Sequence, residues 1–365
     1  MLLQLKTNIL KEKLHNWGFS FLGLVLLTSL HSCTEEKHNH FPQLRYEIAG
    51  EAQGTTYNIV YFTKEATIQK NQVDSVLDEI DLAASVWVEN SLISKFNNSS
   101  DSIFKVPFQT NSFFLDNFQM CKEVYENTNG AYNPTVGELV NAWGFGFKNR
   151  ENMDSLIVDS LLQSVGFSDN QMKLFRDNEV NYISKTNPNT QLDYNGIAQG
   201  YSVDVLADYF KANGVSNFMI EVGGELLANG RKSDGSYWKI GIDEPVTENM
   251  TRKLAATIKL DNMSVATSGN YRKFYEKNGI KYSHTIDPNT GKPVQHQLLS
   301  TTVITDNCAL ADAYATAFMV MGVSETKLFL EQHSELNLSV YLIFSDSTSK
   351  WNTWQTKDFD EIIVQ

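Results

Sequence analysis

The most constraining feature of this chain is a series of short segments rich in β-branched and aromatic residues, several of them joined by glycine or asparagine turns rather than by helices. Residues of these types favour strands. The expected strands cover residues 57–62, 218–222, 238–242, 254–260, 301–305 and 338–344. The pattern predicts an α+β fold in which packed helices cover a mainly antiparallel sheet, and it excludes the regular βαβ alternation of a dinucleotide-binding fold.

Four other segments carry apolar residues at helical spacing, which predicts helices that pack by one face. They cover residues 73–84, 114–125, 197–209 and 309–322. The chain has 365 residues, of which 42% are hydrophobic, so it can bury a sizeable core. Its three cysteines, Cys33, Cys121 and Cys308, are too few for a disulfide framework, and we expect the last two to be buried thiols.

The N-terminus has the pattern of a bacterial lipoprotein leader. Three lysines precede an uncharged apolar run at 19–30, which as a helix spans about 18 Å, too short for a bilayer core of roughly 30 Å. Leu30 and Ser32 precede Cys33 as in a lipoprotein box, so Cys33 is the predicted lipidation site. We expect a signal peptide at 1–32, a tether at 33–43 and a single domain at 44–365. The mature protein is then a membrane-anchored lipoprotein outside the cytoplasm, on the periplasmic side.

The charge balance limits the class of partner. The chain has 30 basic and 43 acidic residues and a net charge of -13, which becomes -15 when the leader's three lysines and one glutamate are removed. Binding to nucleic acid requires clustered Lys and Arg that neutralise phosphates, so we expect no nucleic-acid partner. Any anionic ligand must be held by local features of its site.

Asp312 and Thr316 are the most informative local pair. On a helix they lie four residues apart and face the same side, among small alanines. A carboxylate and a hydroxyl are hard oxygen ligands that suit Mg²⁺. The alternative is that Asp312 satisfies the helix N-terminus and Thr316 bonds back into its helix.

Two further segments contain candidate site residues. Asp193 ends a β-like stretch, and Gly196 and Gly200 flank the expected start of a helix, where free amides bind anions. Asp193 can equally be a helix N-cap. His284, beside a hydroxyl-rich strand and a DPNTG turn, is a candidate base, although a lone loop histidine is more often a hydrogen-bonded spectator.

Taken in order, these segments and several others resemble the ApbE family of FAD:protein FMN transferases. The motifs are QGTTYNI at 53–59, SKFN at 94–97, GAYNPT at 130–135, LDYNGIAQGYSVD at 192–204, EVGGE at 221–225, ATSGNYRKF at 266–274, HTIDPNTGKPV at 284–294 and ALADAYATA at 309–317. Eight motifs in one order are far more specific than any single one. The resemblance implies an ApbE-like, T-fold-like domain.

The resemblance also implies an activity. It is the Mg²⁺-dependent transfer of FMN from FAD, through a phosphoester bond, to a Ser or Thr hydroxyl of an acceptor flavoprotein, with release of AMP. The acceptors are flavin-carrying subunits marked by a short Asp-Gly-x-Ser/Thr-Gly-Ala-Ser/Thr-type motif. Two alternatives are a Mg²⁺-dependent FAD pyrophosphatase, which gives FMN and AMP, and a lipid-anchored flavin-binding protein without catalysis.

By the same resemblance, each candidate residue receives a role. Asp312, Thr316 and the main-chain carbonyl of Gly196 hold Mg²⁺, and His284 activates the acceptor hydroxyl. The implied FAD contacts are Gln53, Ala131, Tyr132, Asn133, Asp193 and Gln199. The sequence departs from the family pattern at Gln199, where many members carry Lys, and at Gln53, where Met is common.

Overall fold

The central element is an eight-stranded sheet in which every neighbouring pair is antiparallel. The computed structural model describes residues 43–107, 111–146, 153–245, 253–270, 274–277, 280–346 and 350–364. In spatial order the strands are β1 (Leu44–Ala52), β2 (Thr55–Thr63), β6 (Asn217–Val222), β7 (Glu225–Asn229), β10 (Met263–Gly269), β15 (Leu298–Thr305), β16 (Ser339–Ser345) and β17 (Trp351–Gln355). All described residues belong to one compact unit, Pro42–Gln365.

Shorter strands form four smaller sheets. The three-stranded sheet has the order β3 (Ile103–Lys105), β5 (Val180–Lys185) and β4 (Met172–Asp177). The remaining pairs are β8 (Trp238–Asp243) with β9 (Leu254–Leu260), β11 (Phe274–Lys277) with β12 (Ile280–Ser283), and β13 (Ile286–Asp287) with β14 (Lys292–Pro293). Each pair is antiparallel, so the predicted fold class is confirmed.

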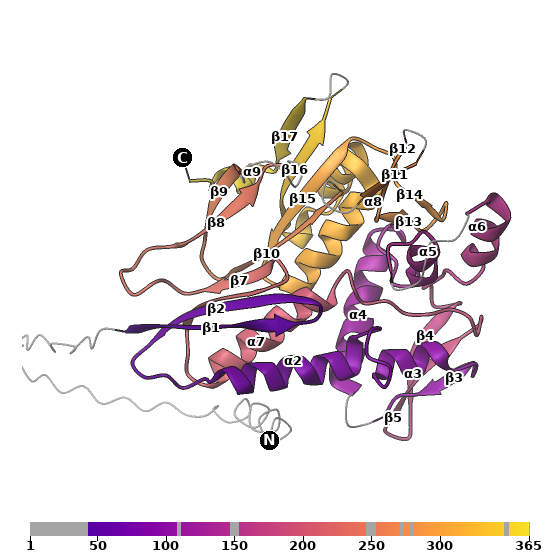
Figure 1. Ribbon diagram of the computed structural model, residues 1–365, viewed down its shortest axis with the longest axis horizontal. Coiled ribbons are helices and arrows are strands. Elements are labelled where there is room, and N and C mark those ends of the chain that lie inside the picture. Colours follow the sequence, from indigo (N-terminus) through magenta and orange to yellow (C-terminus); the bar gives the residue numbers. More distant parts are fainter. Residues whose placement is uncertain are drawn as a thin grey trace, which may run out of the picture. The chain divides into compact units, whose positions relative to one another are not determined.

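Helices cover one face of the large sheet (Figure 1). The described helices are α2 (Lys70–Ala84), α3 (Leu92–Asn98), α4 (Asn111–Asn127), α5 (Gly137–Ala142), α6 (Ser155–Leu162), α7 (Ala198–Ala212), α8 (Cys308–Gln332) and α9 (Lys357–Asp360), with a 3₁₀ turn at Ser334–Leu336, and α9 lies on the other face. The larger hydrophobic core joins α2, α4, α7 and α8 to residues of β2, β6 and β15. Burial of that apolar surface is the main stabilising contribution to this layer.

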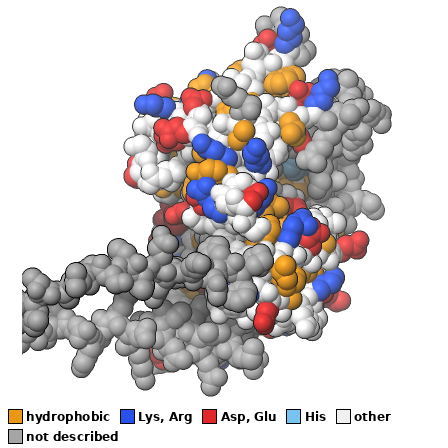
Figure 2. Space-filling model, turned by 90° about the vertical axis from the view of Figure 1, so that its left-hand side faces the viewer, with side chains coloured by type: hydrophobic (Ala, Val, Ile, Leu, Met, Phe, Trp, Pro, Cys, Tyr) orange, Lys and Arg blue, Asp and Glu red, His pale blue; other side chains and the backbone are white. Residues whose placement is uncertain are grey.

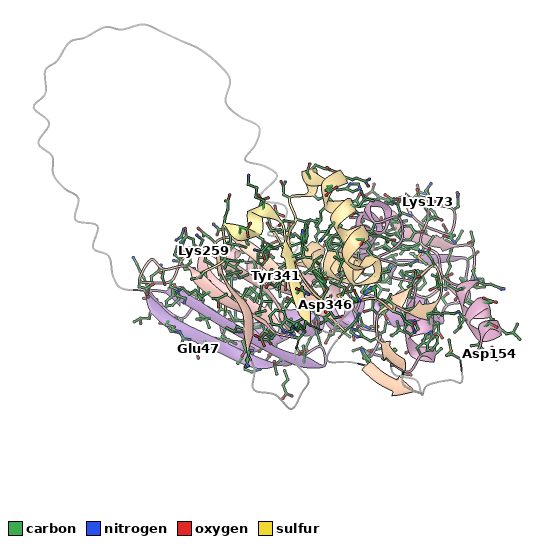
Figure 3. The ribbon with its side chains drawn as sticks, turned by 90° about the horizontal axis from the view of Figure 1, so that it is seen from above. Glu47, Asp154, Lys173, Lys259, Tyr341 and Asp346 are labelled. Atoms are coloured by element: carbon green, nitrogen blue, oxygen red, sulfur yellow. The ribbon has the colours of Figure 1, made fainter. Side chains whose placement is uncertain are left out.

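The opposite face of the sheet is covered by the β8–β9 hairpin and α9. Tyr341 of β16 stacks on Phe359 of α9, with ring centroids 5.1 Å apart. Figure 3 shows Tyr341 in the interior, with Lys259 of β9 nearby and Glu47 and Asp154 at the periphery. The sheet is therefore buried on both faces, with the longer helices on one side only.

All six predicted strands and all four predicted helices are present. In the large sheet, β1, β7, β10 and β17 were not predicted from the sequence, nor were the strands β3–β5 and β11–β14 of the smaller sheets. β10 contains the run ATSG at 266–269, part of one of the quoted motifs, whose small residues gave no clear strand pattern. Ala266 is fully buried under the helix layer. Close packing by α8, which a single sequence does not display, explains why a strand here is built of small residues.

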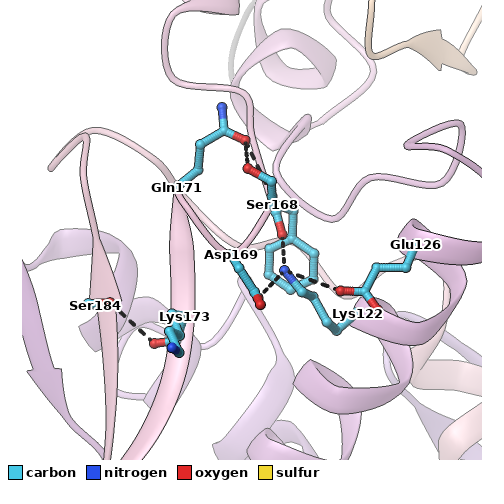
Figure 4. Close-up of polar contacts among 8 residues, drawn as sticks. Lys122, Glu126, Ser168, Asp169, Gln171, Lys173 and Ser184 are labelled. Atoms are coloured by element: carbon cyan, nitrogen blue, oxygen red, sulfur yellow. Dashed lines mark hydrogen bonds and ion pairs between the residues drawn. The ribbon is translucent and has the colours of Figure 1, made fainter.

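The small sheet is tied to α4 by a lysine (Figure 4). The Nζ of Lys122 donates to the carbonyl oxygen of Phe167, 2.6 Å away, and forms an ion pair with Asp169 at 2.9 Å. In the same loop, the N–H of Gly166 donates to the hydroxyl of Thr135. The contacts therefore hold the loop before β4 against the segment that contains the predicted flavin contacts at 131–133.

Three predictions concern the cysteines, the absence of a membrane-spanning helix and the N-terminal leader. Cys121 and Cys308 are free and buried, as expected. No helix in the described ranges is long and apolar enough to span a bilayer. The predicted signal peptide, the lipidation site Cys33 and all of the tether except Gln43 lie outside the described residues. On the face shown in Figure 2, basic and acidic side chains are interspersed.

Candidate active site

The starts of α7 and α8 lie in direct backbone contact. A Cβ at Gly200 would be 2.3 Å from the carbonyl oxygen of Cys308, a distance that real side chains do not reach. Glycine at this position therefore allows the two helices to approach closely. The contact brings the segment that contains Asp193 and Gly196 to the first turns of α8.

The N-terminus of α8 is satisfied without Asp312. Asn307 is the N-cap, and its side chain accepts from the N–H of Leu310 at 2.8 Å. The two carboxylate oxygens of Asp204, from α7, accept from the N–H groups of Cys308 and Ala309, each at 2.9 Å. These contacts satisfy three of the donors that a helix N-terminus leaves free. The alternative in which Asp312 performs this capping role is therefore wrong.

Asp312 lies deeper, between α8 and the sheet. Its side chain is 5% exposed, and the main-chain N–H of Gly200 donates to its carboxylate. Its Oδ2 is buried without a hydrogen-bond partner. Burial, followed by the nearby charge of Glu225, holds the pKa of Asp312 well above its usual range. An unpartnered buried carboxylate oxygen is unfavourable unless a proton or a cation neutralises it.

Thr316 and Gly196 complete the oxygen set. A Cβ at Gly196 would be 3.3 Å from the Oγ1 of Thr316 and 3.4 Å from the ring of Tyr132. The hydroxyl of Thr316 also lies 3.5 Å from that of Ser268 in β10. The structure therefore places together the two predicted ligands on α8 and the glycine whose carbonyl was predicted as the third.

These residues fit a hard divalent cation. A carboxylate with a free oxygen, a hydroxyl and a main-chain carbonyl are the donors that Mg²⁺ accepts while it keeps water and phosphate oxygens. Among the described residues no group of three or more His, Cys, Asp and Glu side chains could hold a metal ion. A metal centre of that kind is therefore not found in the described ranges.

Asp193 lies at the entrance to α7 but does not cap it. The N-cap of α7 is Ile197, which makes no side-chain capping bond. The Oδ1 of Asp193 instead accepts from the N–H of Asn195 at 2.8 Å, and burial raises the pKa of its carboxyl group. A Cβ at Gly137 would be 3.1 Å from the Asp193 Cβ. Asp193 therefore belongs to a tight loop that faces the start of α5.

The predicted flavin contacts at 131–133 include one core residue. Tyr132 is 3% exposed and its hydroxyl lies 3.2 Å from the Sγ of Cys121, so its ring fills the interior. The side-chain oxygen of Asn133 accepts from the N–H and the hydroxyl of Thr135. Of the three, Ala131 and Asn133 are only partly buried and remain accessible to a ligand.

Gln53 lies in the turn between β1 and β2, and Gln199 lies near the start of α7. Gln53 has a φ of 55° in the two-residue turn between β1 and β2, and its Nε2 donates to the hydroxyl of Ser202 in α7 at 2.7 Å. Its Oε1 is buried without a partner. The side chain of Gln199 covers Gly223, where an added Cβ would be 2.8 Å from the Gln199 Nε2. A non-glycine residue at positive φ is strained, which is a common property of functional turns.

His284 lies in the loop between β12 and β13, partly buried, with its ring 6.4 Å from that of Phe145. The following residue, Thr285, donates its hydroxyl to Asn270 at 2.8 Å, just after the end of β10. β10 also carries Ser268, the neighbour of Thr316. The loop of His284 is thus attached to the strand that reaches the oxygen set. Residues 271–273 of the ATSGNYRKF motif lie outside the described residues.

Comparison with known proteins identifies the family. The ApbE family model matches residues 53–341. The FAD:protein FMN transferase of Vibrio cholerae is 34% identical over 313 residues, which cover 85% of this chain and 88% of that protein. The chain belongs to the ApbE family. The FAD:protein FMN transferase of Haemophilus influenzae is 31% identical and covers 88% of this chain and 91% of its own length.

Solved ApbE structures share the fold. The flavin transferase ApbE from Vibrio cholerae superposes with a TM-score of 0.76 at 30% identity and covers 88% of this chain and 100% of its own. The apo flavinyl transferase ApbE from Pseudomonas stutzeri also has a TM-score of 0.76, at 29% identity, over 89% of this chain and 98% of its own. The recognition of an ApbE-type α+β fold from ordered motifs is therefore confirmed.

Within this ApbE fold, two residues were missed by the sequence analysis. Trp87 is 64% exposed and lines a cavity of about 330 Å³ together with Gly137 and Asp193. Glu225 is 8% exposed, and its Oε2 is buried without a partner, like the Oδ2 of Asp312. In the sequence, Trp87 is only an aromatic residue after a predicted helix, and nothing else marks it as a site residue. Glu225 lies in the EVGGE motif, where the acidic residue after two glycines was the available signal.

Proposed function

We propose that this ApbE-family protein is an FAD:protein FMN transferase, which moves FMN from FAD onto a Ser or Thr hydroxyl of an acceptor protein and releases AMP. The observation that carries the proposal is the unpartnered buried oxygen of Asp312 beside Thr316 and Gly196. The names of the relatives from Vibrio cholerae and Haemophilus influenzae support the same activity. FAD is the flavin donor in this reaction.

The residues that would hold Mg²⁺ are Asp312, Thr316 and Gly196, the last through its main-chain carbonyl. When bound, the ion would neutralise phosphate oxygens and stabilise the charge that develops as AMP leaves. The apolar surroundings of Asp312 strengthen the electrostatic interaction of its carboxylate with any cation. In a chain of net charge -13, this local site is needed to accept a diphosphate.

The chain's own residues bind FAD and move one proton. Gln53, Ala131, Asn133, Asp193 and Gln199 are the proposed FAD contacts, with Tyr132 supporting them from the core. His284 takes the proton of the acceptor hydroxyl, whose oxygen forms a bond to the phosphorus of the FMN half. The bond between that phosphorus and the oxygen of AMP breaks. Positioned general bases contribute roughly 10²–10⁴-fold to such steps.

The acceptor and the location belong to the same proposal. The acceptor carries a flavinylation motif of the Asp-Gly-x-Ser/Thr-Gly-Ala-Ser/Thr type, in which the Ser or Thr hydroxyl is the nucleophile. Lipidation at Cys33 anchors the enzyme to a membrane outside the cytoplasm, where such flavoproteins work. The sequence pattern of residues 19–33 supports this placement.

A transfer assay separates the candidate activities. The purified protein is mixed with FAD, Mg²⁺ and an acceptor domain, and the products are examined for a fluorescent protein band and for AMP. A transferase gives both products in equal amounts. AMP without a labelled band indicates an FAD pyrophosphatase, and FAD binding without AMP indicates a flavin-binding protein. Either of the last two outcomes contradicts the proposal.

Replacement of His284 tests the proton transfer. If His284 activates the acceptor hydroxyl, His284→Ala lowers protein flavinylation by roughly 10²–10⁴-fold. Hydrolysis of FAD, in which water attacks in place of the acceptor hydroxyl, is expected to continue. The two rates are measured on one sample, by band fluorescence and by AMP release. Equal retention of both removes His284 from the mechanism.

A further inference from the structure

Two glycines fix the position and direction of Glu225. Gly223 and Gly224 have φ values of 69° and 114°, and they form a two-residue hairpin turn because Val222 pairs directly with Glu225. Turns of this type need positive φ, which glycine adopts without strain. Paired residues point to the same face of a sheet. Val222 is fully buried in the helix-side core, so Glu225 also points toward the helix layer.

The strand on the other side confirms that direction. β7 pairs with β10 so that Leu226 lies opposite Val265, which places Glu225 next to Ala266. Ala266 is fully buried in the helix-side core. β10 also carries Ser268 on this face, two residues further toward Thr316. Glu225 therefore points into the space between the sheet and the start of α8, on the face of the sheet that α8 covers.

The carboxylate of Glu225 has no side-chain counterpart there. Its Oε2 is buried and makes no hydrogen bond with any described residue, and the residue is 8% exposed. α8, which carries Asp312, packs against both β7 and β10, so Asp312 and Glu225 lie in the same layer of the core. Two buried carboxyl groups in one layer, each with one oxygen unpartnered, are stable only when protons or a cation neutralise them, and a divalent ion can neutralise both.

We propose that Glu225 is a second carboxylate of the cation site and contributes its charge and its free oxygen to holding the divalent ion beside Asp312. The inference rests on the proposed function, because it assumes the same cation at Asp312 and Thr316. Two carboxylates match the charge of one divalent ion. The Gly223–Gly224 turn then does more than reverse the chain, because it fixes the position of Glu225 at the site on a rigid strand.

The experiment measures Mn²⁺ binding, without FAD and without turnover. Mn²⁺ alone is titrated into the purified protein and followed by calorimetry and by the loss of the free-ion paramagnetic resonance signal. We expect Glu225→Gln, which keeps the shape and removes the charge, to weaken Mn²⁺ binding by about 10–100-fold. Near-ultraviolet circular dichroism establishes that the variant keeps its native packing.

Glu221→Gln is the matched control. Glu221 lies four residues earlier in the same motif, and its oxygens accept from the side chain of Asn58 and from the N–H of Gly224. Both carboxylate oxygens of Glu221 already accept hydrogen bonds without a cation, so the Mn²⁺ affinity of Glu221→Gln is expected to stay within about twofold of wild type. A second readout is the rise in melting temperature on Mn²⁺ addition, which shrinks in Glu225→Gln and persists in Glu221→Gln.

Asp312→Ala separates the two claims. If wild type binds Mn²⁺, Asp312→Ala does not and Glu225→Gln binds as wild type does, the role of Glu225 is overturned and the metal assignment stands. That outcome would mean that Glu225 is neutralised by a proton alone. If Asp312→Ala binds Mn²⁺ as tightly as wild type, or if wild type binds none, the cation site itself is overturned, and the inference with it.

Discussion

Asp204 of α7 and Asp312 of α8 both have their carboxyl groups beside the start of α8, and they are satisfied in different ways. The two oxygens of Asp204 accept from the N–H groups of Cys308 and Ala309, each at 2.9 Å. Asp312 receives one N–H, from Gly200, and its Oδ2 has no partner. The pKa of Asp204 is raised to about 7 by burial, which the two amide hydrogen bonds partly offset, and burial together with the charge of Glu225 holds the pKa of Asp312 well above its usual range.

The difference separates a structural carboxylate from a functional one. Backbone donors at a helix N-terminus can hold a buried acid in place, because they are fixed and would otherwise be unsatisfied. An acid that lies one turn further along the helix finds those donors already used. Its unpartnered oxygen and the neighbouring Glu225 then require a positive charge from outside the protein. Burial alone would have assigned both acids the same role.

The largest expected effect is on catalysis in Asp312→Ala. Loss of the carboxylate removes the charge that would hold the cation, and the rate of AMP release should fall by roughly 10²–10⁴-fold, which corresponds to several kcal/mol. The free energy of unfolding should change little, because the lost carboxylate was poorly satisfied. AMP is measured by chromatography and unfolding by urea. Wild-type turnover in this variant, after chelator treatment and return to Mg²⁺ buffer, would contradict the metal assignment.

Asp204→Ala should show the opposite pattern. It leaves two N–H donors of α8 without partners, so the free energy of unfolding at pH 5 should fall by about 2–3 kcal/mol. Mn²⁺ affinity should remain within a few-fold of wild type, provided that the protein is folded at the assay temperature. Urea unfolding and Mn²⁺ titration on the same preparation give both numbers. A large loss of Mn²⁺ affinity without destabilisation would reverse the assignment of the two acids.

The pH dependence of Asp204→Ala sharpens the comparison further. A carboxyl with a folded pKa of about 7 and an unfolded pKa near its ordinary value holds its proton more tightly in the folded state. Its contribution to stability is therefore present below about pH 4 and is lost as the pH rises to about 7. The destabilisation by Asp204→Ala should be smaller at pH 8 than at pH 5, by about 2–3 kcal/mol. A larger destabilisation at pH 8 would mean that the helix amides outweigh burial.

Asn307→Ala is expected to have the smallest effect. The side chain of Asn307 satisfies one donor, the N–H of Leu310, and N-cap replacements cost about 1 kcal/mol. The melting temperature should fall by a few degrees, with AMP release unchanged at temperatures where the protein is folded. A strong loss of activity without loss of stability would show that the N-terminus of α8 acts in catalysis.

The sequence predicted the parts of this fold that depend on local pattern. The strands at 218–222 and 338–344 and the helix that carries Asp312 and Thr316 follow from apolar periodicity and β-branched content. β10 could not be predicted in this way, because its run of small residues is selected by the packing of α8 against it. That β10 is a strand of the large sheet is seen only in the structure, where α8 packs against it.

The candidate site was predicted as a set of residues rather than as a geometry. That Asp312 and Thr316 share a helix face follows from their spacing, and the structure adds that Gly196 lies against Thr316. The capping by Asp204 could not be foreseen, because it crosses 104 positions of the chain. Neither could the orientation of Glu225, which depends on the pairing of β7 with two other strands. The roles of His284 and of the flavin contacts stay predictions.

A crystal structure of the protein with FAD and Mn²⁺ tests the central claim most directly, because the anomalous scattering of manganese locates the ion without reference to activity. We predict one anomalous peak bounded by the carboxylate of Asp312, the hydroxyl of Thr316 and the carbonyl of Gly196, in contact with the FAD diphosphate. FAD bound with its diphosphate away from these oxygens, and no manganese between them, would contradict the account.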